Sequence, residues 1–474
     1  MSQFDKLKRL GQLSAENASI LAERAARHMI EHHQKGGGCL REAVNLICEI
    51  ATHQDSEIAR AGIRALFPSL VERLNDSFEP TACRLYDQLF AQVIEFCRHR
   101  PGGEKLNEGL KQFGLLNEAD LLLRKSVIQM ENFWPPIAIP KKVLLPSRVT
   151  IGADVAVTST IIAKLQQIMP HTEFVILGSR KLRELFGGDT QIRIREIAYE
   201  RGGSLIGRLT SWLDAVEAVR QERRGFGHDE FWVVDPDSRI TQLGLLPLVE
   251  DDKNYFFFES RSYQPDGEAT SIGQIAARWC SQLTGNYEPA YPFVNLPVEH
   301  QLFGKFVARS LRKIQTTTTG LVTISFGVGG NQSKRVSAEF EQDLVERLLL
   351  DSKLIVDKGA NQEEREQIDL IVANILRQGK KVVELTETNK NRIAEKDLSQ
   401  ADVVTWDGGI GVFAGLIAES DQYIGYDSAG QHIAAALGLP TQTFFVSSNN
   451  AKFSERWRPF GKGMIGHSIQ HRIG

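Results

Sequence analysis

The sequence predicts an α/β protein in which two Rossmann-like domains follow an all-helical N-terminal domain. Apolar residues recur at helical spacing through about the first 130 residues. Strand-like apolar runs then alternate with helical segments, which is typical of doubly wound parallel sheets. The alternation pauses at the threonine-rich stretch Thr316–Gly320 and then starts again. We therefore expect three domains, at residues 1–133, 141–315 and 320–474.

Length and composition describe a globular, multidomain protein. The chain has 474 residues, which is too long for one ordinary core. Hydrophobic residues make up 42% and charged residues 24%, so the chain is not largely disordered. The net charge of -3 excludes a strongly basic nucleic-acid-binding protein.

The cysteines and the N-terminal residues predict a cytoplasmic location. Five cysteines form an odd set, which indicates reduced thiols rather than a disulfide framework. Residues 1–10 carry lysine and arginine without a following apolar run, so we expect no signal peptide. Nor does any stretch reach the roughly 20 apolar residues of a membrane span. Contact with a membrane surface stays open.

The first 130 or so residues are expected to form about five helices. Breaks are predicted at Gly36–Gly38, at Asn75-Asp76 and at Pro101–Gly103, because these residues interrupt helical periodicity. Cysteines and histidines occur in this region without the paired spacing of a metal site, so no metal is expected.

A proline-rich stretch at residues 133–140 marks the expected boundary to the first α/β domain. Predicted strands there are residues 143–145, 174–177, 194–197, 231–235 and 255–258, with helices at 155–169, 209–220 and 272–283. In the second α/β domain we expect strands at 322–326, 354–356, 382–385, 422–424 and 441–446, helices at 338–350 and 363–378, and a further element at 412–418.

The stretch Tyr423–Pro440 reads as a strand end, a loop of small residues and a short helix that begins near His432. Short side chains let backbone amides point into one space, and a helix N-terminus favours anions there. Gly438 and Pro440 end the helix. This stretch is either an anion site or a plain connection.

Two further loops follow the first strand of each expected sheet. Gly327–Arg335 is rich in glycine and ends with two cations, so its amides and Lys334 could meet a phosphate. We expect this loop to lie beside the Tyr423–Pro440 loop in the same sheet. Thr150–Val155 is a glycine turn that delivers Asp154 to a helix N-terminus. Asp154 is either a helix cap or a general base.

These loops carry a family resemblance. Their order, followed by Asp-Ser-x-Gly-x-His-Ile-Ala-Ala-Ala-Leu-Gly-Leu-Pro-Thr at residues 427–441 and Glu-Arg-Trp-Arg-Pro-Phe-Gly at 455–461, resembles the bacterial heptosyltransferases of glycosyltransferase family nine. The match covers roughly residues 142–461. It implies a GT-B enzyme that transfers a sugar from a nucleotide diphosphate sugar, with inversion and without a catalytic metal or other cofactor. The chain departs from the family pattern at the inserted Ala153 and at Ala429, where glycine is usual.

The resemblance also implies roles for single residues. Asp154 aligns with the catalytic carboxylate that takes the proton of the acceptor hydroxyl, and Lys334 with the lysine that meets the diphosphate. Candidate diphosphate-binding residues are Gly329, Gly330, Lys334, Arg335, Ser428, Ala429, Gly430 and His432. Candidates for contact with the nucleoside are Gln362 and Glu363.

The acceptor side is less defined. Arg148, Asp235 and Arg239 are candidates because they lie on or near strand-end loops. Asp235-Pro236-Asp237 could also be a turn or a metal-binding Asp-x-Asp. The implied acceptor is a glycan, a lipopolysaccharide-type lipid-linked glycan or a protein, and the helical domain could dock a protein partner.

Two alternatives stay open from the residues alone. In an NAD-dependent oxidoreductase, Gly327–Gly330 would hold the dinucleotide and Asp357 its ribose. In a catalytically inactive scaffold protein, the helical domain would dock a partner.

Overall fold

The computed structural model describes residues 13–130, 139–199, 203–263, 270–313, 320–329, 331–446 and 451–470. The chain divides into two compact units, Met1–Pro146 with Arg195–Gln264 and Ser147–Ile194 with Pro265–Gly474. Most of the expected boundary at 133–140 and of the threonine-rich stretch Thr316–Gly320 lies outside the described residues, which include only 139, 140 and 320 of them.

The described residues before the first strand are helical. The predicted breaks at Gly36–Gly38, Asn75-Asp76 and Pro101–Gly103 are confirmed, and further breaks follow Ala51 and Gln112. The break after Ala51 ends at Asp55, which is the N-cap of the next helix. Its carboxylate accepts from the amides of Glu57 and Ile58. The elements are α2 (Ala15–Gln34), α3 (Arg41–Ala51), α4 (Ser56–Arg64), η1 (Ala65–Val71), α5 (Glu72–Asn75), α6 (Pro80–Arg98), α7 (Glu104–Gln112) and α8 (Glu118–Met130).

The first sheet has five strands in the order β3-β2-β1-β4-β5. The predicted strands are confirmed within a few residues, and β1 pairs with β4 in parallel. The strands are β1 (Lys142–Pro146), β2 (Glu173–Gly178), β3 (Ile192–Glu196), β4 (Phe231–Asp235) and β5 (Tyr255–Phe257). The helical segments are α9 (Ile151–Ala153), η2 (Asp154–Thr158), α10 (Ser159–Ile168), η3 (Arg180–Leu182), α11 (Arg183–Phe186), α12 (Leu205–Thr210), α13 (Trp212–Arg223), η4 (His228–Glu230), η5 (Asp252–Asn254) and α14 (Ile272–Thr284).

The second sheet has seven strands in the order β12-β11-β10-β6-β7-β9-β8. Two of them, β9 and β12, were not predicted from the sequence. The strands are β6 (Gly320–Ser325), β7 (Ser352–Asp357), β8 (Val382–Thr386), β9 (Val403–Asp407), β10 (Gln422–Tyr426), β11 (Thr441–Val446) and β12 (Ile465–Gln470). The helical segments are α15 (Val298–Arg312), η6 (Gln332–Lys334), α16 (Ala338–Leu348), α17 (Gln362–Arg377), α18 (Glu395–Gln400), α19 (Ile410–Ala418), α20 (Ala429–Ala436) and α21 (Ala451–Trp457).

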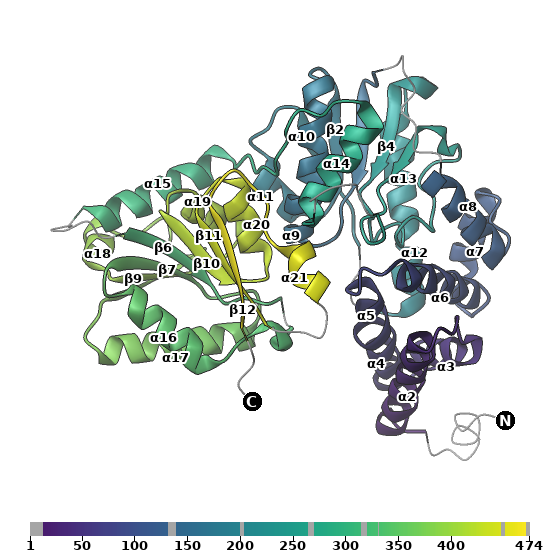
Figure 1. Cartoon of the computed structure of the whole chain (residues 1–474), viewed down its shortest axis with the longest axis horizontal. Helices are drawn as coiled ribbons and strands as arrows, with labels where there is room; N and C mark the ends of the chain where they lie inside the picture. Colours follow the sequence, from purple (N-terminus) through teal and green to yellow (C-terminus); the bar gives the residue numbers. More distant parts are fainter. Residues whose placement is uncertain are drawn as a thin grey trace. The chain divides into compact units, whose positions relative to one another are not determined.

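Helices cover both faces of the second sheet (Figure 1). Helices α16 and α17 lie on one face, and α15, α19 and α20 lie on the other. The first face packs an apolar core that includes Ile324, Val345, Val356 and Ile371. Burial of such side chains stabilises each by about 1.5–3 kcal/mol relative to exposure. This packing fixes the strand ends that carry the candidate site.

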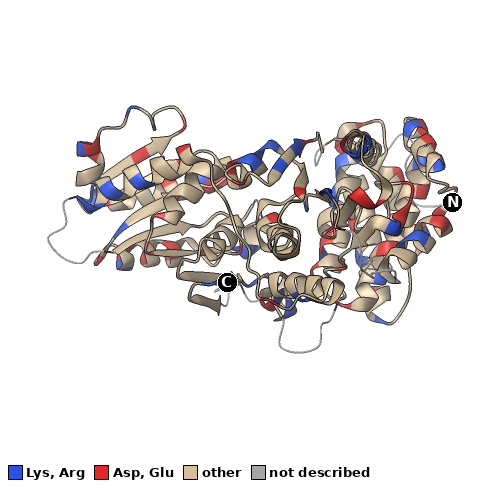
Figure 2. Ribbon diagram, turned by 90° about the horizontal axis from the view of Figure 1, so that it is seen from above, with Lys and Arg blue, Asp and Glu red and all other residues tan. Residues whose placement is uncertain are grey.

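Charged residues of both signs are interspersed along the chain (Figure 2), in keeping with the net charge of -3. No helix in the described ranges is both long enough and apolar enough to span a bilayer.

Candidate functional site

The segment that follows β10 forms the start of a helix. Ser428 has extended backbone angles, φ -150 and ψ -176, and is the N-cap of α20. The helix therefore begins at Ala429, and the expectation that it begins near His432 was wrong. Ala429 and Gly430 lie in its first turn, where backbone amides lack partners within the helix. This places a helix N-terminus at the end of β10.

The end of β10 lies beside the end of β6. The two strands are parallel neighbours, with Ile424 opposite Ile324 and Gly425 opposite Ser325. The glycine-rich loop after β6 and the loop at Asp427 therefore leave the same edge of the sheet from adjacent strands. The expectation that they lie side by side in one sheet is confirmed.

Asp427 is the centre of a small polar cluster at this edge. Its Oδ2 accepts from Lys334 Nζ at 2.6 Å, and its Oδ1 accepts from the side-chain amide of Gln431 at 2.7 Å. The same amide nitrogen lies 3.2 Å from the carbonyl of Trp457 and 3.3 Å from His432 Nε2. Sequence reasoning gave no role to Gln431 or to the carboxylate of Asp427, and only the structure brings them together with Lys334.

His432 is buried beside this cluster, with 3% of its surface exposed. Burial lowers its pKa to about 4, a shift that Asp427 opposes and Lys334 reinforces. The imidazole is therefore neutral near pH 7. It can offer a hydrogen bond to an anion but not a positive charge.

Gly152 brings the Asp154 segment against the start of α20. A Cβ added at Gly152 would lie 3.2 Å from Ala429 Cα and 3.2 Å from His432 Cδ2. These distances are tighter than ordinary van der Waals contact, so a side chain at residue 152 would crowd α20. Because glycine has no side chain, the backbone of the Asp154 segment can pack directly against the start of α20. A buried carboxylate, a helix N-terminus and the Asp427 cluster are thus gathered in the second unit.

Asp154 is fully enclosed in this arrangement, with 1% of its surface exposed. Its Oδ2 accepts from Ser147 Oγ at 2.6 Å, and its Oδ1 accepts from the amide of Arg148 at 2.8 Å and from Thr158 Oγ1 at 2.9 Å. Burial raises the pKa of Asp154, although these hydrogen bonds oppose the shift. The carboxylate holds the loop before α9 and is not open to solvent.

The glycine-rich loop is tied down by a residue that sequence reasoning missed. Glu364 accepts from the amide of Val328 at 2.9 Å and from the amide of Ala360 at 2.8 Å, so it links the loops after β6 and β7. Its sequence signal is a capping pattern, because Asn361 is the N-cap of α17 and Glu364 stands three residues later. The predicted nucleoside residues Gln362 and Glu363 lie exposed in the first turn of α17.

The glycines of this loop can be described only in part. Gly329 has φ +63, and a Cβ added there would meet nothing within 4 Å. The position thus favours glycine for its backbone angle rather than for lack of space. Gly330 lies outside the described residues.

Arg335 does not face the diphosphate-binding candidates. Its Nε donates to Glu341 Oε1 at 2.9 Å, its Nη2 contacts Glu341 Oε2, and the residue is 8% exposed. Tyr426 Oη donates to the same Glu341 Oε1 at 3.0 Å. A guanidinium held in a two-point pair inside the protein has a structural role. We therefore leave Arg335 out of the candidate site.

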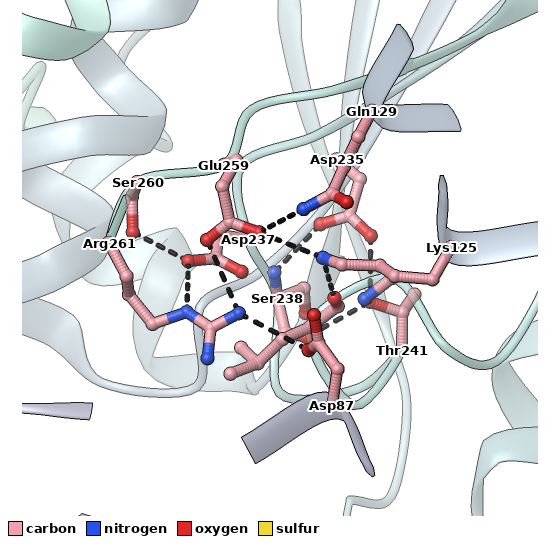
Figure 3. A network of polar contacts seen from close by, with 12 residues as sticks. Asp87, Lys125, Gln129, Asp235, Asp237, Ser238, Thr241, Glu259, Ser260 and Arg261 are labelled. Atoms are coloured by element: carbon pink, nitrogen blue, oxygen red, sulfur yellow. Dashed lines mark hydrogen bonds and ion pairs between the residues drawn. The ribbon is translucent and has the colours of Figure 1, made fainter. Parts of the chain in front are cut away.

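Asp235 is likewise interior, with 0% of its surface exposed. It accepts from the amide of Ser238 at 2.7 Å and from Thr241 Oγ1 at 2.7 Å (Figure 3). It also contacts Tyr255 Oη. These bonds close the buried loop after β4. Both oxygens of Asp235 are engaged within this loop, so an acceptor contact by Asp235, like one by Asp154, would require these bonds to open. We assign Asp235 a structural role in closing the loop.

The two acceptor-side arginines fall in different units. Arg239 is half-buried in the first unit, and its carbonyl accepts from Tyr199 Oη at 3.1 Å. Arg148 belongs to the second unit and donates its amide to Asp154.

Comparison with known proteins gives matches in structure but not in sequence. No family model matches the sequence, and no curated protein matches it. The chain is similar in structure to glycosyltransferases of family nine. A family 9 glycosyltransferase from Veillonella parvula is 13% identical with a TM-score of 0.47, over 70% of this chain and 87% of that chain.

Two E. coli enzymes give similar values. ADP-heptose LPS heptosyltransferase II is 13% identical with a TM-score of 0.42, over 70% of this chain and 89% of that one. A heptosyltransferase solved with ADP is 12% identical with a TM-score of 0.44, over 70% of this chain and 93% of that one.

Proposed function

We propose that this protein is a glycosyltransferase of GT-B form that moves a sugar from a nucleotide diphosphate sugar to an acceptor hydroxyl. The reaction inverts the anomeric centre and needs no catalytic metal. Residues 320–474 bind the donor, residues 141–315 face the acceptor, and residues 1–133 recruit a glycan, lipid-linked or protein partner. The observation that carries the proposal is the packing of Gly152 against Ala429 and His432, which sets the Asp154 segment against the start of α20.

The start of α20 suits the diphosphate of the donor. The amides of Ser428, Ala429 and Gly430 lie at a helix N-terminus, where partial positive charge favours phosphate. Lys334 is within reach, because its Nζ already binds Asp427 Oδ2 at the same edge. On donor binding Lys334 exchanges Asp427 for a phosphate oxygen. Negative charge grows on the leaving diphosphate, so these fixed donors stabilise the transition state more than the ground state.

Asp154 is the group we assign to the acceptor proton. The acceptor oxygen forms a bond to the anomeric carbon, the bond from that carbon to the diphosphate breaks, and the hydroxyl proton passes to the Asp154 carboxylate. Burial raises the pKa of Asp154, which makes the carboxylate a stronger base. In this step Asp154 gives up its bond from Ser147 or Thr158, so the loop before α9 has to open toward the acceptor.

A second candidate function is a binding protein that keeps the nucleotide site without catalysis. The enclosure of Asp154, with 1% exposure and hydrogen bonds to both oxygens, favours it. The oxidoreductase alternative is less favoured. The glycine-rich loop leads into η6, and α16 begins only at Ala338, so the loop does not open a helix as a dinucleotide site requires.

Ligand binding tests the donor site. Nucleoside diphosphates are expected to raise the unfolding temperature, whereas NAD and NADH leave it unchanged. Lys334→Ala should weaken the preferred nucleoside diphosphate at least about tenfold, since a charge-assisted hydrogen bond contributes about 1.5–3 kcal/mol. Lys396→Ala, at an exposed lysine of α18, is the control and should bind as wild type. Equal affinity of Lys334→Ala and wild type would rule out the assigned role of Lys334.

Turnover separates the two candidate functions. With a panel of nucleotide diphosphate sugars, the wild type should release nucleoside diphosphate when acceptor is present. Asp154→Asn should lower this rate at least about a hundredfold while nucleotide binding persists. A wild type that binds nucleoside diphosphates and never transfers sugar would be the binding protein instead. An Asp154→Asn variant with full turnover would remove Asp154 from the reaction.

A further inference from the structure

Helix α15 has one face that the rest of the protein covers. Its buried residues include Gly304, Val307 and Leu311, and the helix packs on α18 and α19. A Cβ added at Gly304 would lie 2.1 Å from the carbonyl oxygen of Gly415. This close approach fixes the rotation of α15 about its axis. The opposite face must therefore point outward.

The outward face of α15 is apolar where a soluble helix is normally polar. Val298 is 64% exposed, Leu302 is 60% exposed and Phe306 is 37% exposed. The three residues are four positions apart, so they form one stripe along the first three turns. Exposed apolar residues are common singly, but a stripe opposite the buried side indicates a surface that meets another apolar phase.

Positive charges share this outward face. Lys305, Arg309 and Lys313 are exposed at the same helical spacing and continue the stripe toward the end of the helix. Lys313 pairs with Glu395 at 3.1 Å, but both side chains are about half exposed, so this pair is weak. Glu299 is the only acidic residue in the sequence of the helix. The stripe thus combines apolar and cationic side chains.

We propose that α15 docks this protein on an anionic lipid surface. A helix that lies in the plane of a membrane interface buries its apolar side chains below the headgroups and sets lysines and arginines against lipid phosphates. Val298, Leu302 and Phe306 are the apolar side chains that insert below the headgroups. Lys305 and Arg309 are the cations that contact the lipid phosphates. The net charge of the whole chain is -3, so attraction to an anionic surface has to come from such a local patch.

A second copy of the chain fits this surface less well. In a twofold dimer the same face meets itself, so Lys305, Arg309 and Lys313 would approach like charges of the partner. The lipid-docking proposal also does not depend on the proposed transferase reaction. A protein with no enzymatic activity could dock in the same way.

Vesicle binding by the 474-residue chain is the test. Flotation compares phosphatidylcholine vesicles with vesicles that contain phosphatidylcholine and phosphatidylglycerol. The wild type should float with the anionic vesicles only. Binding should fall when salt is raised from about 0.1 M to about 1 M, because the Debye length shrinks from about 10 Å to about 3 Å.

Variants assign the binding to α15. Val298→Ser with Leu302→Ser and Phe306→Ser, and separately Lys305→Gln with Arg309→Gln, should each weaken vesicle binding at least about tenfold. The control is Leu370→Ser with Leu376→Ser, which changes leucines of α17 that are 63% and 52% exposed on the other face of the sheet. The control should bind as wild type, and circular dichroism should show all variants folded.

Three results would overturn the proposal. One is a wild type that does not float with anionic vesicles or that binds neutral vesicles equally well. Another is a control that loses as much binding as the α15 variants. The third is a wild type that does not bind vesicles and sediments as a dimer, while the Val298→Ser, Leu302→Ser, Phe306→Ser variant sediments as a monomer. The face would then be an interface between copies of the chain.

Discussion

At the scale of single residues, His432 combines burial with closeness to charge. An ordinary histidine has a pKa of about 6.5 when exposed, whereas the pKa of His432 is lowered to about 4 by burial. Between about pH 6.5 and about pH 4, His432 is therefore protonated in the unfolded chain and neutral in the folded chain. Across this window the free energy of unfolding falls as pH falls. Above about pH 6.5 both states are neutral at this residue and the effect vanishes.

This linkage gives a prediction for His432→Gln, which keeps a polar side chain but cannot titrate. Wild type should lose about 2 kcal/mol more stability than the variant between about pH 7.5 and about pH 5. Urea unfolding of both proteins at the two pH values measures the difference, and shared titrations of other groups cancel in it. The exposed His467→Gln is the control and should follow wild type. Parallel pH profiles for His432→Gln and wild type would show that His432 is not held neutral.

At the scale of elements, the start of α20 is shaped by the strand before it. A Cβ added at Gly430 would lie 2.2 Å from Tyr423 Oη, and one added at Gly425 would lie 2.6 Å from the same atom. The phenol of β10 thus fills the space that side chains at these positions would need. The shift of glycine from residue 429 to residue 430 has a packing reason, because Gly430 is the residue that faces Tyr423.

Gly430→Ala should therefore destabilise the protein by about 1–3 kcal/mol through overpacking. Adding Tyr423→Phe removes the oxygen and should recover part of this loss, so the two substitutions are expected to couple. Gly38→Ala is the control, because a Cβ there meets nothing within 4 Å and its φ is not positive. Thermal and urea unfolding of the single and double variants measure the coupling. Additive effects would mean that the phenol is not what excludes a side chain at residue 430.

Elements with strong local signals were predictable from the sequence, and those with weak signals were not. The strands at 143–145, 174–177 and 231–235 and the breaks at glycine and proline carry periodicity or turn chemistry, and the structure confirms them. Strand β9 is a short run, Val-Val-Thr-Trp-Asp, whose place between β7 and β8 depends on partners distant in sequence. Strand β12 lies at the sheet edge and depends on β11 in the same way.

For the candidate site, the sequence predicted that the two loops lie side by side in one sheet. It could not predict which carboxylate each cation of the glycine-rich loop would pair with. Arg335 follows Lys334 directly, yet it pairs with Glu341 inside the protein while Lys334 pairs with Asp427. Which cation faces the site depends on the turn of η6, and glycine-loop composition does not specify it. The hydroxyl partners of Asp154, Ser147 and Thr158, likewise carry no motif.

At the scale of the whole molecule, the helical region and the strands of the first unit share a buried ionic network (Figure 3). Arg261, after β5, is 4% exposed and contacts Asp237 at 3.2 Å, Glu259 at 3.2 Å and Asp87 of α6 at 3.7 Å. Lys125 of α8 donates to the carbonyl of Leu243 at 2.6 Å and to Glu259 at 3.0 Å. Helices α6 and α8 thus supply charges that the loops after β4 and β5 require. Residues 195–264 fall in one compact unit with the helices, and this network is one of the contacts that join them.

Lys125 provides the test of this coupling. Burial alone would raise the pKa of Glu259, but Arg261 and Lys125 lower it to about 2, so the carboxylate is ionised across the neutral range and needs its cations. Lys125→Met keeps the length of the side chain, removes the charge and leaves the Leu243 carbonyl without this donor. The loss should be about 3 kcal/mol in urea unfolding near pH 7, the lower end for breaking a buried ion pair. Adding Glu259→Gln should recover part of the lost stability, because the uncompensated charge is then removed.

The control is Lys105→Met, at an exposed lysine of α7, which should change stability by less than about 0.5 kcal/mol. Equal effects at Lys125 and Lys105 would mean that α8 is not anchored through this network and that the helical region folds independently of the strands.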